Sequence, residues 1–279
     1  MGNYYCLMAG LPDISLNDRK NAPTIAELRE EIENVLSDSD KRLLSYFFLK
    51  YDCQNIVRLL NNPNASLLPN GNYTLEQYRD LITSAQEMNY NVHRYPSFMS
   101  IYAREYPNNK GKVGFFAEDA MMLEYYKYAM GCPNKMIADW YEFNFNVTNI
   151  LTAMIARKNE WNVGDYILGD NEVTETIRMN SAKDFSLSKE YDYVADLMKV
   201  VDETDPVLKE KKIDVFRWAW LDERTFFNTF SIEAVFAYFC KLEMLERWEH
   251  LNEEEGKAVF EQIIENLRGE AQVPAEFKR

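Results

Sequence analysis

Apolar residues recur with helical spacing along most of the chain. Thr24 and Glu27 have the spacing of a capping box, and the apolar run after them predicts a helix. A second helix is predicted from about Asp38, because its apolar residues repeat every three or four positions as far as Leu60. Thr74 begins another capping-box pattern. Further helical patterns cover 118–130, 136–154, 171–180, 186–202, 206–222, a segment from 231 and a last one from 252.

Signals for β-structure are scarce. The chain has ten glycines and nine prolines in 279 residues, and its one Asn-Gly pair, at Asn70, lacks flanking alternation of apolar and polar residues. Residues 89–112 are expected to be irregular or a crossing between units, because they contain Pro96, Pro107, Asn108, Asn109 and Gly111. The fold class predicted from these patterns is all-α.

A short motif recurs on the predicted helices. The stretch YDCQNIVRLL at 51–60 returns as FNVTNILTAM at 145–154, and a weaker third copy is KLEMLERWEHL at 241–251. The matching polar pairs are Asp52 with Asn55, Asn146 with Asn149, and Glu243 with Glu246. The spacings, 146 less 52 being 94 and 243 less 146 being 97, are each about a third of the chain.

These intervals predict three pseudo-repeated helical units, at 1–100, 101–204 and 205–279. Equivalent units that stack on one another generate a ring or a funnel, so the whole is expected to be funnel-shaped or triangular. Two polar residues three positions apart share one face of a helix. Each pair is therefore expected either to satisfy backbone groups or bond a neighbouring helix of its own unit, or to line a central opening shared by the three units.

The charge excludes several classes of ligand. With 31 basic and 45 acidic residues the net charge is −14, which repels nucleic acid and anionic lipid headgroups. Four widely separated cysteines without a CxxC pair are expected to be reduced, mostly buried thiols of a cytosolic protein. The first residues carry no signal-peptide pattern and no segment is apolar enough to cross a membrane, so direct membrane insertion is not expected.

No pattern of an active site is present in the sequence. His93 and His250 lack a glutamate three residues before them, and neither GxxxxGK nor GxGxxG occurs. We therefore predict no catalytic residue, no metal site and no cofactor. An enzyme that brings a histidine from far away to a serine or cysteine stays open as an alternative.

An aromatic segment is the other conspicuous cluster. It runs from Tyr95 to Tyr106 and is followed by Phe115 and Phe116. Packing in the core or between units is the simpler interpretation, and a hydrophobic docking surface for a partner is the alternative.

The three motif segments resemble the C subunit of V/A-type rotary ATPases, which is subunit d of eukaryotic V-ATPases. FLKYDCQNIVRLL at 48–60 is most similar, WYEFNFNVTNILTAMIARKN at 140–159 includes the downstream bases Arg157 and Lys158, and SIEAVFAYFCKLEMLERWEHL at 231–251 has acids in place of Asp and Asn. The resemblance implies a funnel-shaped, all-helical, non-catalytic central-stalk subunit. Its partners would be the rotor shaft subunits and the membrane proteolipid ring, between which it transmits torque for ion transport.

The resemblance is to a divergent member of that family. The chain is on the short side, Asn146 stands where the family more often has an acid, and an Asn-rich loop at 61–73 interrupts the first unit. The resemblance implies a cytoplasmic protein held at the membrane through the ATPase complex. A helical scaffold or adaptor protein unrelated to ATPases is the alternative function.

Overall fold

The computed structural model describes residues 4–16, 21–87, 94–112 and 116–249. Every regular element in these ranges is a helix, which confirms the all-α prediction. The helices are α1 (Tyr5–Gly10), α2 (Ile25–Ile32), α3 (Asp38–Asn61), α4 (Leu75–Gln86), α5 (Ser97–Asn109), α6 (Ala117–Met130), α7 (Lys135–Lys158), α8 (Glu172–Met179), α9 (Val194–Asp202) and α10 (Pro206–Thr225), with 3-10 turns η1 (Val163–Asp165) and η2 (Leu187–Lys189) and a helix over 232–249.

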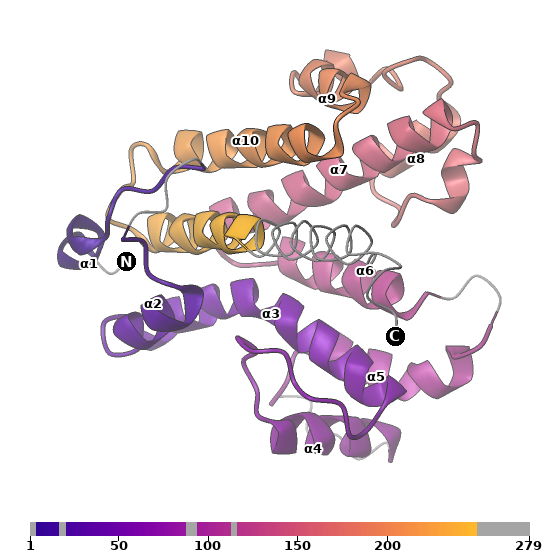
Figure 1. Ribbon diagram of the computed structural model, residues 1–279. Coiled ribbons are helices and arrows are strands. Elements are labelled where there is room, and N and C mark those ends of the chain that lie inside the picture. The colour runs from indigo at the N-terminus through magenta and orange to yellow at the C-terminus, as the bar shows by residue number, and fades with distance from the viewer. Residues whose placement is uncertain (1–3, 17–20, 88–93, 113–115, 250–279) are drawn as a thin grey trace, which may run out of the picture.

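Three helix–turn–helix pairs make up the body of the molecule (Figure 1). They are α2 with α3, α6 with α7, and α10 with the helix over 232–249. The second helix of each pair carries one copy of the motif. The repeat itself and the three unit boundaries remain predictions, and the boundary at residue 100 falls inside α5.

Side-chain caps set where the helices begin. The predicted capping boxes at Thr24 and Thr74 are both formed, so α2 and α4 start where the sequence indicates. The side chains of Ser37 and Asn134 accept backbone N–H bonds at the starts of α3 and α7. Asp205 caps α10, with Pro at its first position, where the missing N–H costs nothing.

Aromatic residues join the three helix pairs into one core. The helix over 232–249 lies between α3 and α7, and its Phe236 ring centroid is 6.4 Å from that of Phe47 and 6.1 Å from that of Tyr141. On the other side of α7, Phe143 stacks on Trp220 of α10 at 5.1 Å. Buried side chains from all three helix pairs belong to this single core. The pairs are therefore packed against one another and do not have separate cores.

Two segments differ from the sequence-based expectation. Residues 97–109, expected to be irregular, form α5, whose one internal proline lies near its end and removes only one backbone hydrogen bond. The helix expected over 186–202 is divided into η2 and α9, with residues 190–193 between them, and Ser186 at its expected start has a positive φ angle, which a right-handed helix does not contain. The last predicted helix, from 252, lies outside the described residues.

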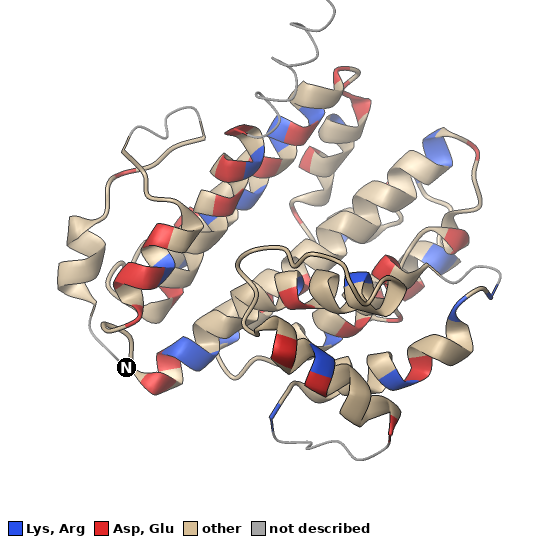
Figure 2. Cartoon of the chain, turned by 60° about the horizontal axis from the view of Figure 1, so that its bottom comes forward, with Lys and Arg blue, Asp and Glu red and all other residues tan. Residues whose placement is uncertain are grey.

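The aromatic segment at 95–106 is mainly core. Tyr95, Phe98, Tyr102 and Tyr106 are buried, whereas Phe116 is 67% exposed. All four cysteines are free, and three of them are buried while Cys6 is exposed. Among the helices that the structure describes, none is both long and apolar enough to cross a bilayer. In the view of Figure 2, acidic and basic residues are interspersed along the helices.

Candidate functional site

The first motif pair fastens α3 to the loop that follows it. Asp52, which has no exposed surface, accepts hydrogen bonds from the backbone N–H and the side-chain amide of Asn72, both at 2.6 Å, and from the Tyr78 hydroxyl at 2.5 Å. Asn55 exchanges two bonds with the backbone of Leu68, accepting at 2.7 Å and donating at 3.2 Å. Both side chains therefore bind backbone and side-chain groups of the Asn-rich loop and the start of α4.

The loop passes close to α3 at Gly71. A Cβ atom at this position would lie 2.4 Å from the Tyr78 hydroxyl and 2.9 Å from Asp52 Oδ1. From the other side, Arg29 of α2 donates to the carbonyls of Asn70 and Gly71 at 3.1 and 3.0 Å. Glycine is thus required for the loop to approach the buried carboxylate.

The second motif pair makes corresponding contacts. Asn149 accepts a bond from the backbone N–H of Leu168 at 2.7 Å, and Asn146 accepts one from the side chain of Asn171 at 2.7 Å. Asn171 is the N-cap of α8. An arginine holds this loop as well, here from the helix after the motif: Arg178 of α8 donates to the carbonyl of Gly169 at 2.7 Å.

These first two pairs share one mode of action. In each, the second residue of the pair holds a leucine backbone in the loop after the motif helix. The first residue holds an asparagine close to the next helix: Asn72, two residues before the N-cap of α4, and Asn171, the N-cap of α8. Asp52, Asn55, Asn146 and Asn149 are all at most 3% exposed. They bond segments of their own predicted unit and do not line a central opening.

The third pair contacts a different part of the chain. Glu246 accepts the N–H of Ile25, the first residue of α2, at 2.8 Å. Glu243 accepts from the Tyr51 hydroxyl at 3.1 Å and forms an ion pair with Lys50. The helix over 232–249 is thereby bonded to α2 and α3, so polar contacts of this pair link the last described helix to the first helix pair.

A pocket of about 590 Å³ lies where the three motif helices approach one another. Only the third motif pair is part of its lining. The lining residues come from α3, the Asn-rich loop, α7, α10 and the helix over 232–249, and they include Gln54, Asn70, Trp140, Asn144, Asp214, Arg217, Cys240, Glu243, Glu246 and Arg247.

A buried carboxylate dominates one wall of this pocket. Asp214 has no exposed surface, and its Oδ2 accepts from Arg247 and, at 2.7 Å, from the indole N–H of Trp248. Its Oδ1 lies 3.9 Å from Arg217 Nη1, too far for a hydrogen bond. Within the described part of the chain, Asp214 Oδ1 and Arg217 Nε are buried without a hydrogen-bond partner.

Burial affects the ionisation of two titratable side chains at the pocket, Tyr51 and Cys240. Burial and the neighbouring Glu243 carboxylate raise the pKa of Tyr51, and burial raises the pKa of the Cys240 thiol. Both groups therefore stay neutral, and a neutral thiol is a poor nucleophile. Burial also raises the pKa of Asp52, although its bonds to Tyr78 and Asn72 and the charge of Arg29 act in the opposite direction.

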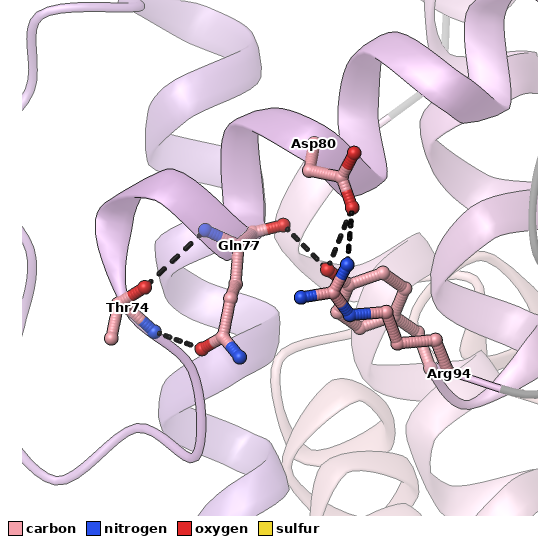
Figure 3. Close-up of polar contacts among 5 residues, drawn as sticks. Thr74, Gln77, Asp80 and Arg94 are labelled. Carbon is pink, nitrogen blue, oxygen red and sulfur yellow. Dashed lines mark hydrogen bonds and ion pairs between the residues drawn. The ribbon is translucent and has the colours of Figure 1, made fainter.

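A polar cluster at the start of α4 is structural. Thr74 and Gln77 exchange capping bonds of 2.8 and 3.3 Å (Figure 3). Asp80 pairs with Arg94 at 3.2 Å, and the Tyr95 hydroxyl donates to Asp80 at 3.0 Å and to the Gln77 carbonyl at 3.2 Å. These contacts connect Arg94 and Tyr95, which precede α5, to α4. The Asp80–Arg94 ion pair is exposed and therefore contributes little energy.

No group of three or more histidine, cysteine, aspartate or glutamate side chains suited to a metal ion occurs in the described ranges. Both histidines, His93 and His250, lie outside those ranges. The enzyme alternative, which depends on them, therefore stays a prediction. Sequence reasoning missed Asp214 and Arg217. The available signal was that Asp214 precedes the buried Leu221 by seven residues and therefore lies on the buried face of α10.

Comparison with known proteins gives a family without an assigned activity. No curated protein and no solved structure matches the chain. Residues 1–271 match the family described as "Protein of unknown function (DUF2764)". The match covers the chain from its first residue almost to its last, so the chain belongs to the DUF2764 family.

Proposed function

We propose that the protein is a non-catalytic central-stalk subunit of a V/A-type rotary ATPase, which couples the rotor shaft to the membrane proteolipid ring for ion transport. The proposal starts from the resemblance of the three motif segments to the C subunit of these ATPases. It includes attachment to the membrane through the other subunits of the complex, on the cytoplasmic side.

The observation that carries the proposal is how the motif pairs are used. Asp52 with Asn55 and Asn146 with Asn149 are buried and bond their own loops in corresponding ways. Polar residues that hold loops and helix starts in place have a structural role. Such a role suits a subunit that transmits torque, because that subunit must resist deformation.

The pocket between the motif helices supports a second element of the proposal. It contains the buried and unsatisfied Asp214 Oδ1, and it is bordered by Arg217, Arg247 and Glu243. Asp214 Oδ1 is itself out of a partner's reach, whereas Glu243, Glu246 and Arg247 are partly exposed at the pocket and supply charges that a bound protein segment would contact. We assign this pocket to the contact with the shaft.

Co-purification tests the assignment. A tagged chain is recovered from detergent-solubilised membranes, and the accompanying proteins are identified by mass spectrometry. The proposal predicts that the proteolipid and the catalytic ATPase subunits accompany it. Recovery of the chain without any ATPase subunit would contradict the proposal and would favour the alternative, a helical scaffold or adaptor unrelated to ATPases.

Two variants make the test specific to the pocket. Gln54 is an exposed residue at the pocket, so Gln54→Trp fills the opening without disturbing the core. Gln86, exposed at the end of α4 and outside the pocket lining, provides the matched control Gln86→Trp. The proposal predicts loss of the shaft subunits with the first variant only. Equal recovery with both variants would remove the pocket from the shaft contact.

A further inference from the structure

A second, smaller cleft is lined by residues of the last turns of α7 and of α9. These two helices are neighbours in Figure 1. Its volume is about 220 Å³, room for one or two side chains. Met154 from α7 and Met198 and Val201 from α9 supply its apolar surface. Methionine side chains are flexible and polarizable, so they adapt to partners of different shape.

Three cations surround this apolar surface. Arg157, Lys158 and Lys183 line the cleft together with a single carboxylate, that of Asp202. The cleft is therefore locally positive in a chain whose net charge is −14. Asp184 follows Lys183 in sequence but is not among the residues that line the cleft, and its carboxylate accepts the N–H of Ser186 at 3.0 Å.

Two of these cations are held in position by the fold. Arg157 donates to the carbonyl oxygens of Asn180, at 3.1 Å, and Ala182, and its guanidinium carbon lies 3.8 Å from the centroid of the Phe185 ring. Lys158 donates to the carbonyl of Val201 at 3.2 Å. An arginine has five N–H donors and a lysine three, so both groups keep donors for a ligand. Binding would cost little side-chain entropy, because these two positions are already fixed.

Part of this positive charge has an internal use. Arg157 and Lys158 lie in the last turn of α7, where cations stabilise the helix dipole. Lys183 lies on neither α7 nor α9 and is exposed. Its charge is the one most available to a partner.

We propose that this cleft binds an acidic segment of a protein partner, with an aliphatic side chain seated between Met154 and Met198 and carboxylates facing Arg157, Lys158 and Lys183. The charge of the cleft selects a short acidic ligand. The net charge of the whole chain disfavours a long polyanion such as nucleic acid. This inference does not depend on the proposed ATPase function.

Fluorescence anisotropy with a synthetic peptide tests the proposal. The probe is a fluorescein-labelled peptide with leucine at helical spacing and glutamate between. One comparison peptide has serine in place of leucine and another has lysine in place of glutamate. The proposal predicts saturable binding of the probe and weaker binding of both comparison peptides. Absence of saturable binding by the full-length protein would overturn it.

Matched variants locate the binding. Lys183→Glu is expected to weaken binding by about tenfold, as loss of a charge contact does. Lys189→Glu changes the net charge equally at an exposed residue of η2 outside the cleft lining, and it is expected to leave the affinity within about twofold. Equal weakening by both variants would reduce the effect to overall charge and would overturn the proposal.

Two further measurements separate the apolar contact and the lipid alternative. Met198→Gln is expected to weaken binding of the probe peptide by about threefold, while the circular dichroism spectrum stays that of the wild type. Vesicles containing phosphatidylserine test the other source of anionic groups. Binding to these vesicles that Lys183→Glu abolishes, without binding to the peptide, would replace the protein partner by a membrane and overturn the proposal.

Discussion

Replacing Asp52 by alanine tests the structural role of the motif. The substitution removes the acceptor for three donors, namely the backbone N–H and side-chain amide of Asn72 and the hydroxyl of Tyr78. Asp52 has no exposed surface, so no water replaces the carboxylate without rearrangement of the loop. The surroundings would keep three donors that the native fold satisfies with one side chain.

The expected loss of stability follows from these contacts. A buried donor left without a partner costs about 1–3 kcal/mol. Two effects make the loss for the three donors smaller than three times this cost. Asn72 is partly exposed, so water can bind its donors, and the substitution also removes an ionised carboxylate that is unfavourable in a buried position. We expect Asp52→Ala to lower the free energy of unfolding by about 3 kcal/mol. Asn146→Ala removes only the bond from Asn171 and should cost about 1 kcal/mol.

Urea denaturation followed by far-ultraviolet circular dichroism measures these differences, provided that the slope with denaturant is unchanged. Asp38→Ala is the matched control, because Asp38 is an exposed residue in the first turn of the same helix. Its cost should stay below about 1 kcal/mol. A loss for Asp52→Ala no larger than that for Asp38→Ala would refute the assignment of Asp52 as a loop anchor.

Three further predictions follow from the same contacts. Gly71→Ala should destabilise the fold by about 1–3 kcal/mol, since its Cβ would overlap the Tyr78 hydroxyl, whereas Gly10→Ala, with open space around it, should be neutral or slightly stabilising in thermal melts. Because burial raises the pKa of Asp52 from 3.8, the folded state binds this proton more tightly than the unfolded chain does. The free energy of unfolding of the wild type relative to Asp52→Asn should therefore fall as pH rises from 3.8 through the raised pKa, and a rise would contradict this. Asp214→Ala removes the acceptor shared by Arg247 and Trp248, while Arg247 keeps its ion pair with Glu210, so it should lower the free energy of unfolding by about 2 kcal/mol in urea titrations; an effect below about 1 kcal/mol would disprove its role in joining the last helix pair.

Local patterns in the sequence were sufficient to predict most helices. Two kinds of signal depend only on residues close in sequence: the capping boxes at Thr24 and Thr74, and the apolar stripes of α3 and α7. These helices could therefore be predicted from the sequence alone. The helix α5 could not be predicted in this way, because the proline and asparagines at 107–109 are typical of loops, whereas the buried face of the helix lies earlier, from Phe98 to Tyr106.

The candidate site was less predictable. The motif residues were identified, but their partners lie in loops of irregular conformation, and nothing in the pattern distinguished Asn55, bonded to its own loop, from Glu246, bonded to the first residue of α2. The pocket combines Tyr51, Asp214 and Glu243, which are distant in sequence. Only the tertiary fold brings such residues together.

ATP-driven ion transport measures the central claim most directly. Inverted membrane vesicles are prepared from cells that contain the gene and from cells that lack it, and ion uptake and ATP hydrolysis are recorded together. The proposed coupling role predicts that uptake disappears without this subunit while hydrolysis by the released catalytic sector continues, and that the wild-type gene and Gln86→Trp restore uptake but Gln54→Trp does not. Full ATP-driven ion uptake in vesicles that lack the protein would contradict the account.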